Sequence, residues 1–95
     1  MMTESQIEKK VCQYAVSKGA LQYKFSSPSR RSVPDRMFII GGRVAFIEFK
    51  KPGGKLTKMQ EREINKLADN GCLGAVIDSV ETGKCFIDFW IANVT

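Results

Sequence analysis

A glycine pair between two apolar segments most constrains how this chain can fold. Arg36–Ile40 and Arg43–Lys50 are rich in β-branched and aromatic residues, and Gly41-Gly42 separates them. Two glycines at this spacing are typical of a tight β-hairpin, because both turn residues need positive φ. The sequence therefore predicts an antiparallel hairpin in which the start of the first strand lies beside the end of the second.

Helical and strand patterns flank the hairpin on both sides. Two Thr-x-x-Gln capping boxes precede apolar residues at helical spacing and predict helices over residues 4–18 and 57–70. Further strands are predicted over residues 21–25 and 73–78. In the tail, apolar residues at helical spacing favour a last helix, although the β-prone run at residues 85–87 leaves a strand open. We expect an α/β fold with the order α-β-β-β-α-β-α and helices flanking a small mixed β-sheet.

Composition limits both the chemistry and the compartment. The 95 residues suffice for one hydrophobic core, so we expect a single domain over residues 1–95. Histidine is absent, which excludes Ser-His-Asp and Cys-His nucleophilic sites and metal sites built on imidazole. The three cysteines form no CxxC pair, and the sequence shows neither a signal peptide nor a membrane-spanning apolar run. We therefore expect a cytoplasmic protein with no membrane partner.

Positive charge is unevenly distributed along the chain. Lysine and arginine outnumber the acids 15 to 10, for a net charge of +5, and most of the basic residues precede residue 63. This asymmetry indicates a basic face that binds a polyanion, although an uneven solvated surface would give the same composition. The candidates for phosphate contacts are the basic residues beside loops and strand ends: Arg30, Arg31, Arg36, Lys51, Lys55 and Lys58.

Two carboxylates and a lysine come together at one end of the predicted hairpin. Side chains alternate along a strand, so Glu48 and Lys50 share a face. The hairpin places Asp35, which precedes the first strand, beside Glu48. Oxygen ligands without histidine or cysteine suit Mg²⁺ or Mn²⁺, and Lys50 could orient a bound water or stabilise phosphoryl charge. These residues fit phosphodiester hydrolysis, with a solvated strand end as the alternative for Glu48 and Lys50.

The segments around these residues resemble a nuclease family. Pro34-Asp35, followed by Glu48-Phe49-Lys50, is similar to the PD-(D/E)xK nuclease signature. The longer segments Ser29–Arg36 and Phe46–Leu56 resemble the stand-alone VRR-NUC domains of phages and bacteria, as does the Glu-Ser-Gln-Ile-Glu start. The likeness covers nearly the whole chain. Ser32 departs from it, because the family commonly has glycine at this position.

The resemblance implies a restriction-endonuclease-like core and a role for each matched residue. Asp35 and Glu48 would bind the metal through their carboxylates, together with the backbone carbonyl of Phe49. Lys50 would be the catalytic lysine. Gln60 would reach toward this site from the start of the second predicted helix.

A glutamate of the first helix would also act, through a metal-bound water. Glu4 and Glu8 lie one turn apart on the same helix face, so spacing does not choose between them. We favour Glu8, with Glu4 as the alternative. Either residue could instead be an acid stabilised by the helix dipole.

The resemblance thus predicts a structure-specific DNA endonuclease that depends on Mg²⁺ or Mn²⁺. Its relatives are similar to resolvases of four-way (Holliday) junctions that work as homodimers, in a bacterial or phage-infected cell. Other hypotheses remain: a non-catalytic nucleic-acid-binding module, a nuclease acting on flaps or other DNA structures, a sequence-specific restriction-type nuclease, and a structural protein with a basic surface.

Overall fold

A computed structural model describes residues 1–29 and 32–93. Three helices and four strands follow one another in the predicted order: α1 (Glu4–Ser17), β1 (Leu21–Lys24), β2 (Arg36–Ile40), β3 (Arg43–Phe49), α2 (Lys58–Asp69), β4 (Leu73–Ile77) and α3 (Val80–Ala92). The tail is therefore a helix, as its apolar spacing favoured. Both predicted capping boxes are formed, at the starts of α1 and α2.

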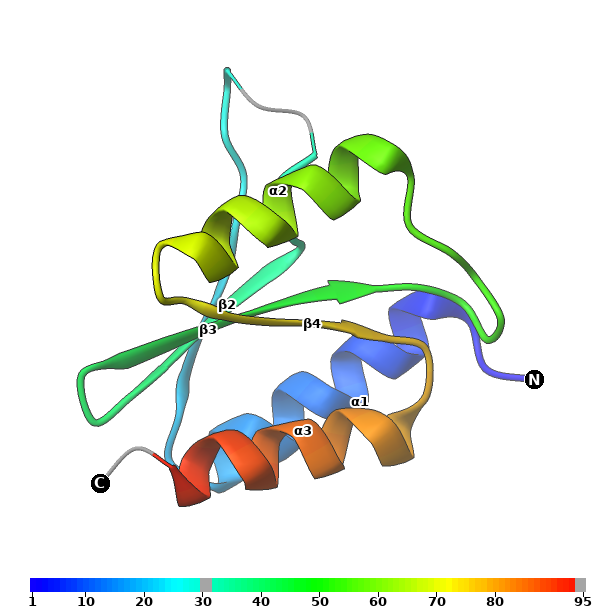
Figure 1. The fold of residues 1–95 in the computed structure, drawn as a ribbon. Coiled ribbons are helices and arrows are strands. Elements are labelled where there is room, and N and C mark those ends of the chain that lie inside the picture. The colour runs from blue at the N-terminus through cyan, green and yellow to red at the C-terminus, as the bar shows by residue number, and fades with distance from the viewer. Residues whose placement is uncertain (30–31, 94–95) are drawn as a thin grey trace.

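The four strands form one mixed sheet in the order β1-β2-β3-β4. β1, β2 and β3 are antiparallel neighbours, and β4 runs parallel to β3. Gly41 and Gly42 have φ angles of 55° and 77°, which allow the tight turn between β2 and β3. Figure 1 shows α2 on one side of the sheet and α1 with α3 on the other.

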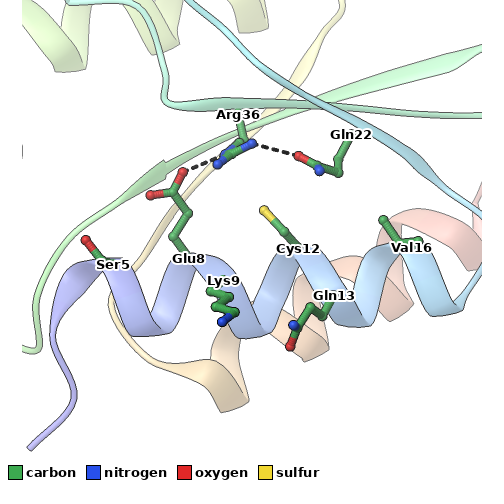
Figure 2. Close-up of a pocket in the computed structure, with 8 residues that line it drawn as sticks. All are labelled: Ser5, Glu8, Lys9, Cys12, Gln13, Val16, Gln22 and Arg36. Carbon is green, nitrogen blue, oxygen red and sulfur yellow. Dashed lines mark hydrogen bonds and ion pairs between the residues drawn. The ribbon is translucent and has the colours of Figure 1, made fainter.

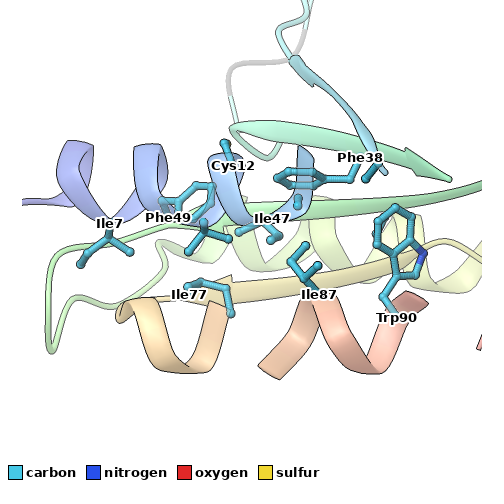
Figure 3. Packing of buried hydrophobic residues seen from close by; sticks show 12 residues of the cluster. Ile7, Cys12, Phe38, Ile47, Phe49, Ile77, Ile87 and Trp90 are labelled. Atoms are coloured by element: carbon cyan, nitrogen blue, oxygen red, sulfur yellow. The ribbon is translucent and has the colours of Figure 1, made fainter. Parts of the chain in front are cut away.

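The main core lies between the sheet and the α1–α3 layer (Figure 3). Alternate β3 residues, such as Ile47 and Phe49, are buried on this side. Trp90 of α3 is 1% exposed and packs edge-on against Phe38, so it belongs to the core. Gly83 lets α3 approach α1 closely, because a Cβ there would overlap a methyl group of Val11.

Two sequence expectations concern the chain as a whole. Cys12, Cys72 and Cys85 are all free thiols. Among the described residues, no helix combines the length and the apolar character needed to cross a bilayer.

Candidate active site

Asp35 and Glu48 face each other on the α2 side of the sheet. Arg36 pairs with Ile47, so the register extended by one residue places Asp35 opposite Glu48. Glu48 is only 4% exposed. Burial raises its pKa to about 7, the negative charge of Asp35 also raises it, and Lys50 opposes both. The structure therefore brings the two predicted carboxylates together in a poorly solvated position.

The backbone of Phe49 completes this end of the hairpin. Its N–H donates a 2.8 Å hydrogen bond to Oδ2 of Asp35. The N–H of Lys50 donates to the carbonyl of Ile77 in β4, so alternation along β3 turns the backbone groups of Phe49 toward the β2 side. On that side, continuing the β2–β3 pairing by two residues places Pro34 opposite Phe49, and proline has no N–H to donate. The Phe49 carbonyl therefore has no β2 donor opposite it and is available beside Asp35.

Lys50 and Gln60 both approach the same oxygen of Glu48. Nζ of Lys50 lies 3.5 Å from Oε2 of Glu48, and Nε2 of Gln60 donates to that oxygen at 3.1 Å. Oε1 of Gln60 accepts a 2.9 Å hydrogen bond from the N–H of Thr57 in the capping box. The cap thus fixes the orientation of the amide and directs its NH₂ group at Glu48. The sequence predicted the capping box, and the resemblance implied that Gln60 reaches toward this site, but neither indicated that the cap orients the amide.

The donor atoms fit a divalent cation that keeps part of its water shell. Among the described residues, no group of three or more His, Cys, Asp or Glu side chains is placed to hold a metal. Oδ1 of Asp35 and Oε1 of Glu48 make no hydrogen bond within these residues. Burial raises the pKa of Asp35 too, and the Phe49 N–H partly offsets this. A bound cation would offset the repulsion between Asp35 and Glu48 and the loss of solvation of their carboxylates. Mg²⁺ and Mn²⁺ can bind a few protein oxygens and complete their coordination shell with water or phosphate.

The two glutamates of α1 have different surroundings. Oε2 of Glu8 accepts a 2.6 Å hydrogen bond from Nε of Arg36, whose Nη1 donates to Oε1 of Gln22 at 2.9 Å (Figure 2). Glu4 is exposed in the first turn of α1, and its negative charge contributes to the raised pKa of Glu48. Glu8 is therefore held in an ion pair, and its charge acts on Asp35 instead.

A cavity of about 560 Å³ opens beside the Glu8–Arg36 pair (Figure 2). Residues of α1, β1 and β2 line it, but Asp35, Glu48 and Lys50 do not. Cys12 borders the cavity, and burial raises the pKa of its thiol to about 11. The thiol is protonated at neutral pH, so this cavity carries no nucleophile comparable to a catalytic cysteine.

The structure separates the candidate DNA contacts into three groups. Arg30 and Arg31 lie outside the described residues. Arg36 uses its Nε and Nη1 within the protein. The exposed ones follow β3 or begin α2: Lys51, Lys55 and Lys58.

Comparison with known proteins agrees with this architecture. No protein-family model matches the chain. It is 40% identical over 80 residues to a protein of Acyrthosiphon pisum secondary endosymbiont phage 1 named "Putative nuclease p44", covering 83% of this chain and 86% of the relative. A solved structure described as "VRR_NUC domain" superposes with a TM-score of 0.80 and 25% identity over 97% of this chain and 98% of that one.

This chain belongs to the VRR-NUC family. A second solved structure, "VRR_NUC domain protein", shares the fold with a TM-score of 0.76 and 20% identity, covering 96% of this chain and 89% of that one. The α-β-β-β-α-β-α order of the VRR-NUC fold places Asp35, Glu48 and Lys50 at one end of the β2–β3 hairpin.

Proposed function

We propose that this VRR-NUC protein is a divalent-metal-dependent endonuclease that hydrolyses phosphodiester bonds in DNA. The observation that carries the proposal is the cluster of Asp35, Glu48 and Lys50 around one buried position. A binding protein would gain nothing from two half-desolvated carboxylates beside a phosphate, because they would repel it. The phage relative, named as a nuclease, supports the same activity.

Asp35, Glu48 and the Phe49 carbonyl would hold Mg²⁺ or Mn²⁺. When bound, such an ion polarises a phosphoryl oxygen and lowers the pKa of a bound water. Lys50 stands beside Glu48, where its ammonium can orient the attacking water and stabilise negative charge on the phosphoryl group. Gln60 keeps the Glu48 carboxylate in place through its fixed amide.

We propose Glu4 as the α1 glutamate that holds a water at this site. The sequence favoured Glu8, but its carboxylate is occupied by Arg36 at 2.6 Å. Glu4 is exposed at the start of α1, and its charge acts on Glu48. Glu8 then has a positioning role, because it ties α1 to Arg36, the residue next to Asp35.

The basic residues would bind the DNA backbone on either side of the cut. Lys51, Lys55 and Lys58 are exposed and lie in the segment that runs from the end of β3 into α2. The Gly53 N–H donates to Oδ2 of Asp78 at 3.2 Å, which anchors this segment to the end of β4. Arg30 and Arg31 are candidates from the sequence alone. Phosphate contacts of this kind make binding weaken steeply with salt.

Four-way junctions are the DNA structure that we propose as the substrate, with a homodimer as the active form. The resemblance to stand-alone VRR-NUC domains motivates both, and a two-fold pair of sites would supply the two symmetric cuts that a junction needs. The reaction would take place in the cytoplasm of a bacterial or phage-infected cell. Cleavage of flaps by the same site is the second candidate.

A cleavage panel tests this function. Wild-type protein is incubated with matched four-way junction, flap and linear duplex DNA, in Mg²⁺, in Mn²⁺ and in EDTA. Paired symmetric cuts in the junction, lost in EDTA, are the expected result. Cutting confined to flaps would replace the junction as substrate. Tight binding without cleavage in any metal would overturn the enzyme and favour a binding module.

A further inference from the structure

β1 forms one edge of the sheet. Its outer side and the face that points away from α1 are less covered by helices than β4 is at the opposite edge. α1 packs against β1, whereas α2 and α3 both pack against β4 at the opposite edge (Figure 1). On the face of β1 that points away from α1, Leu21 is 56% exposed and Tyr23 is 50% exposed. Among the described residues the two edges therefore differ, because two helices pack closely against β4 and one packs closely against β1.

The exposed side chains of β1 continue into an apolar strip on the sheet. Leu21 pairs with Ile39 and Tyr23 pairs with Met37, and paired residues share a face. Ile39 in turn pairs with Val44 of β3. Apolar groups that extend to an open sheet edge gain free energy if the sheet is continued by another strand.

The backbone of β1 has donors and acceptors that point away from the sheet. The Phe25 N–H donates to the carbonyl of Asp35, the residue before β2, so alternation directs the backbone groups of Tyr23 and Leu21 to β2 as well. The backbone groups of Gln22 and Lys24 consequently point outward. Natural edge strands are usually protected by proline, bulges or several charges, and Lys24 is the one such feature in Leu21–Lys24.

We infer that β1 pairs antiparallel with β1 of a second copy of this chain, about a two-fold axis at Gln22. This inference rests on the homodimer of the proposed function and names its surface. A two-fold axis presents the edge to itself, so the outward N–H and carbonyl of each Gln22 meet those of the other copy. Leu21 then lies opposite Tyr23 of the second copy, which joins the two apolar strips.

Charge favours this register over those with the axis closer to Lys24. An axis at Lys24 would place two lysines directly opposite each other, and an axis at Tyr23 would leave them diagonal neighbours at about 7–8 Å. The axis at Gln22 separates the lysines and places Lys24 opposite Ala20 of the second copy. The Ala20 N–H already donates to the Ala15 carbonyl of its own chain, so the Ala20 carbonyl is the group left to accept from Lys24. The joined sheet carries both carboxylate sites on the same side, which suits two cuts in one DNA molecule.

Sedimentation equilibrium of the full chain without DNA tests the surface. Gln22→Pro removes an outward N–H that β1 does not use in the monomer, and Gln22→Ala is its control because it keeps that N–H. Tyr23→Lys places a charge in the apolar strip. Phe89→Lys is its control, because Phe89 is an aromatic residue of similar exposure, 59%, on α3 and outside the strip. We expect the dimer dissociation constant to rise at least 10-fold in Gln22→Pro and Tyr23→Lys and to stay within threefold in both controls. Circular dichroism confirms that each variant is folded.

Oxidative cross-linking tests the register in a Cys72→Ser/Cys85→Ser background. Leu21→Cys combined with Tyr23→Cys is expected to give a covalent dimer, whereas either cysteine alone is not. A cross-link from Tyr23→Cys alone would move the axis to Tyr23 and overturn the register. A wild-type dimer that every variant preserves would overturn this surface while leaving the homodimer intact. A wild-type monomer at all concentrations would overturn both, and the cleavage panel would still decide whether the protein is a nuclease.

Discussion

Gln60 donates a hydrogen bond to Oε2 of Glu48 at 3.1 Å while its own oxygen accepts the N–H of Thr57. One side chain thus caps α2 and holds a buried carboxylate. Because the cap fixes which end of the amide faces Glu48, the residue can only donate there. Helix capping and site geometry are therefore coupled in this protein.

Gln60→Ala and Thr57→Ala should differ in their Mn²⁺ affinity but should have similar unfolding free energies. Both remove part of the same cap and should each cost about 1 kcal/mol of unfolding free energy. Only Gln60→Ala removes the donor that stabilises charged Glu48, so Mn²⁺ binding at pH 7 should weaken about 10-fold and its pH midpoint should rise. Isothermal titration calorimetry measures both quantities. Equal Mn²⁺ affinities in the two variants would show that Gln60 is only a capping residue.

Glu4→Gln and Glu8→Gln should have opposite effects on activity and stability. Glu4→Gln removes an exposed group and should leave the melting temperature unchanged while slowing cleavage at least 10-fold. Glu8→Gln breaks the ion pair with Arg36, which is partly buried, and should lower the unfolding free energy by about 1–2 kcal/mol. Thermal melts and single-turnover cleavage rates are measured on both. The reverse pattern would return the site role to Glu8.

The stability of the metal-free protein should fall as pH rises from about 4.5 to about 7. Glu48 has an ordinary pKa of 4.5, raised to about 7 in the folded state, so the folded protein holds the proton over this window and the unfolded chain releases it. The loss contributed by this group is about 3 kcal/mol at most. The urea unfolding free energy of wild type and Glu48→Gln should therefore converge at low pH and diverge toward pH 7, with wild type the less stable.

A saturating divalent ion should reverse this trend, because it binds the charged carboxylate. The increase in melting temperature on adding Mn²⁺ should be larger at pH 8 than at pH 5 and absent in Glu48→Gln. An increase of the same size at both pH values would place the bound ion elsewhere.

Gly83→Ala should destabilise the protein although alanine is the better helix former. A methyl group at this position would overlap Val11 of α1 and press on Ile77, both of which are buried. Overpacking of this kind costs about 1–3 kcal/mol. Lys84→Ala, on the exposed neighbour in the same helix, is the control and should change the urea unfolding free energy by less than about 0.5 kcal/mol. A Gly83→Ala variant as stable as wild type would show that α1 and α3 can move apart.

Local sequence signals predicted the helices and strands and the proximity of Asp35 to Glu48. The glycine turn fixed the β2–β3 register, and the register placed Asp35 opposite Glu48, so this contact followed from pattern alone. The capping boxes gave the starts of α1 and α2 for the same reason, since each depends on residues three positions apart.

Contacts between distant elements could not be predicted in this way. Arg36 was expected to contact DNA, but its pairing with Glu8 depends on how α1 packs against β2. The same packing distinguishes Glu8 from Glu4, which are equivalent in sequence spacing. The resemblance implied that Gln60 reaches toward the site, but local sequence signals could not predict its hydrogen bond to Glu48, because that bond depends on the position of α2 over β3.

Single-turnover cleavage by Lys50→Ala tests the central claim most directly. The DNA is the best substrate of the cleavage panel, with saturating Mn²⁺, and Lys84→Ala serves as the control because it removes an exposed lysine of α3, on the other side of the sheet from α2. Lys50→Ala should cut at least about 100-fold more slowly while still binding the DNA, and Lys84→Ala should cut within a few-fold of wild type. Cleavage by Lys50→Ala at the wild-type rate would contradict the assignment of the active site to Asp35, Glu48 and Lys50.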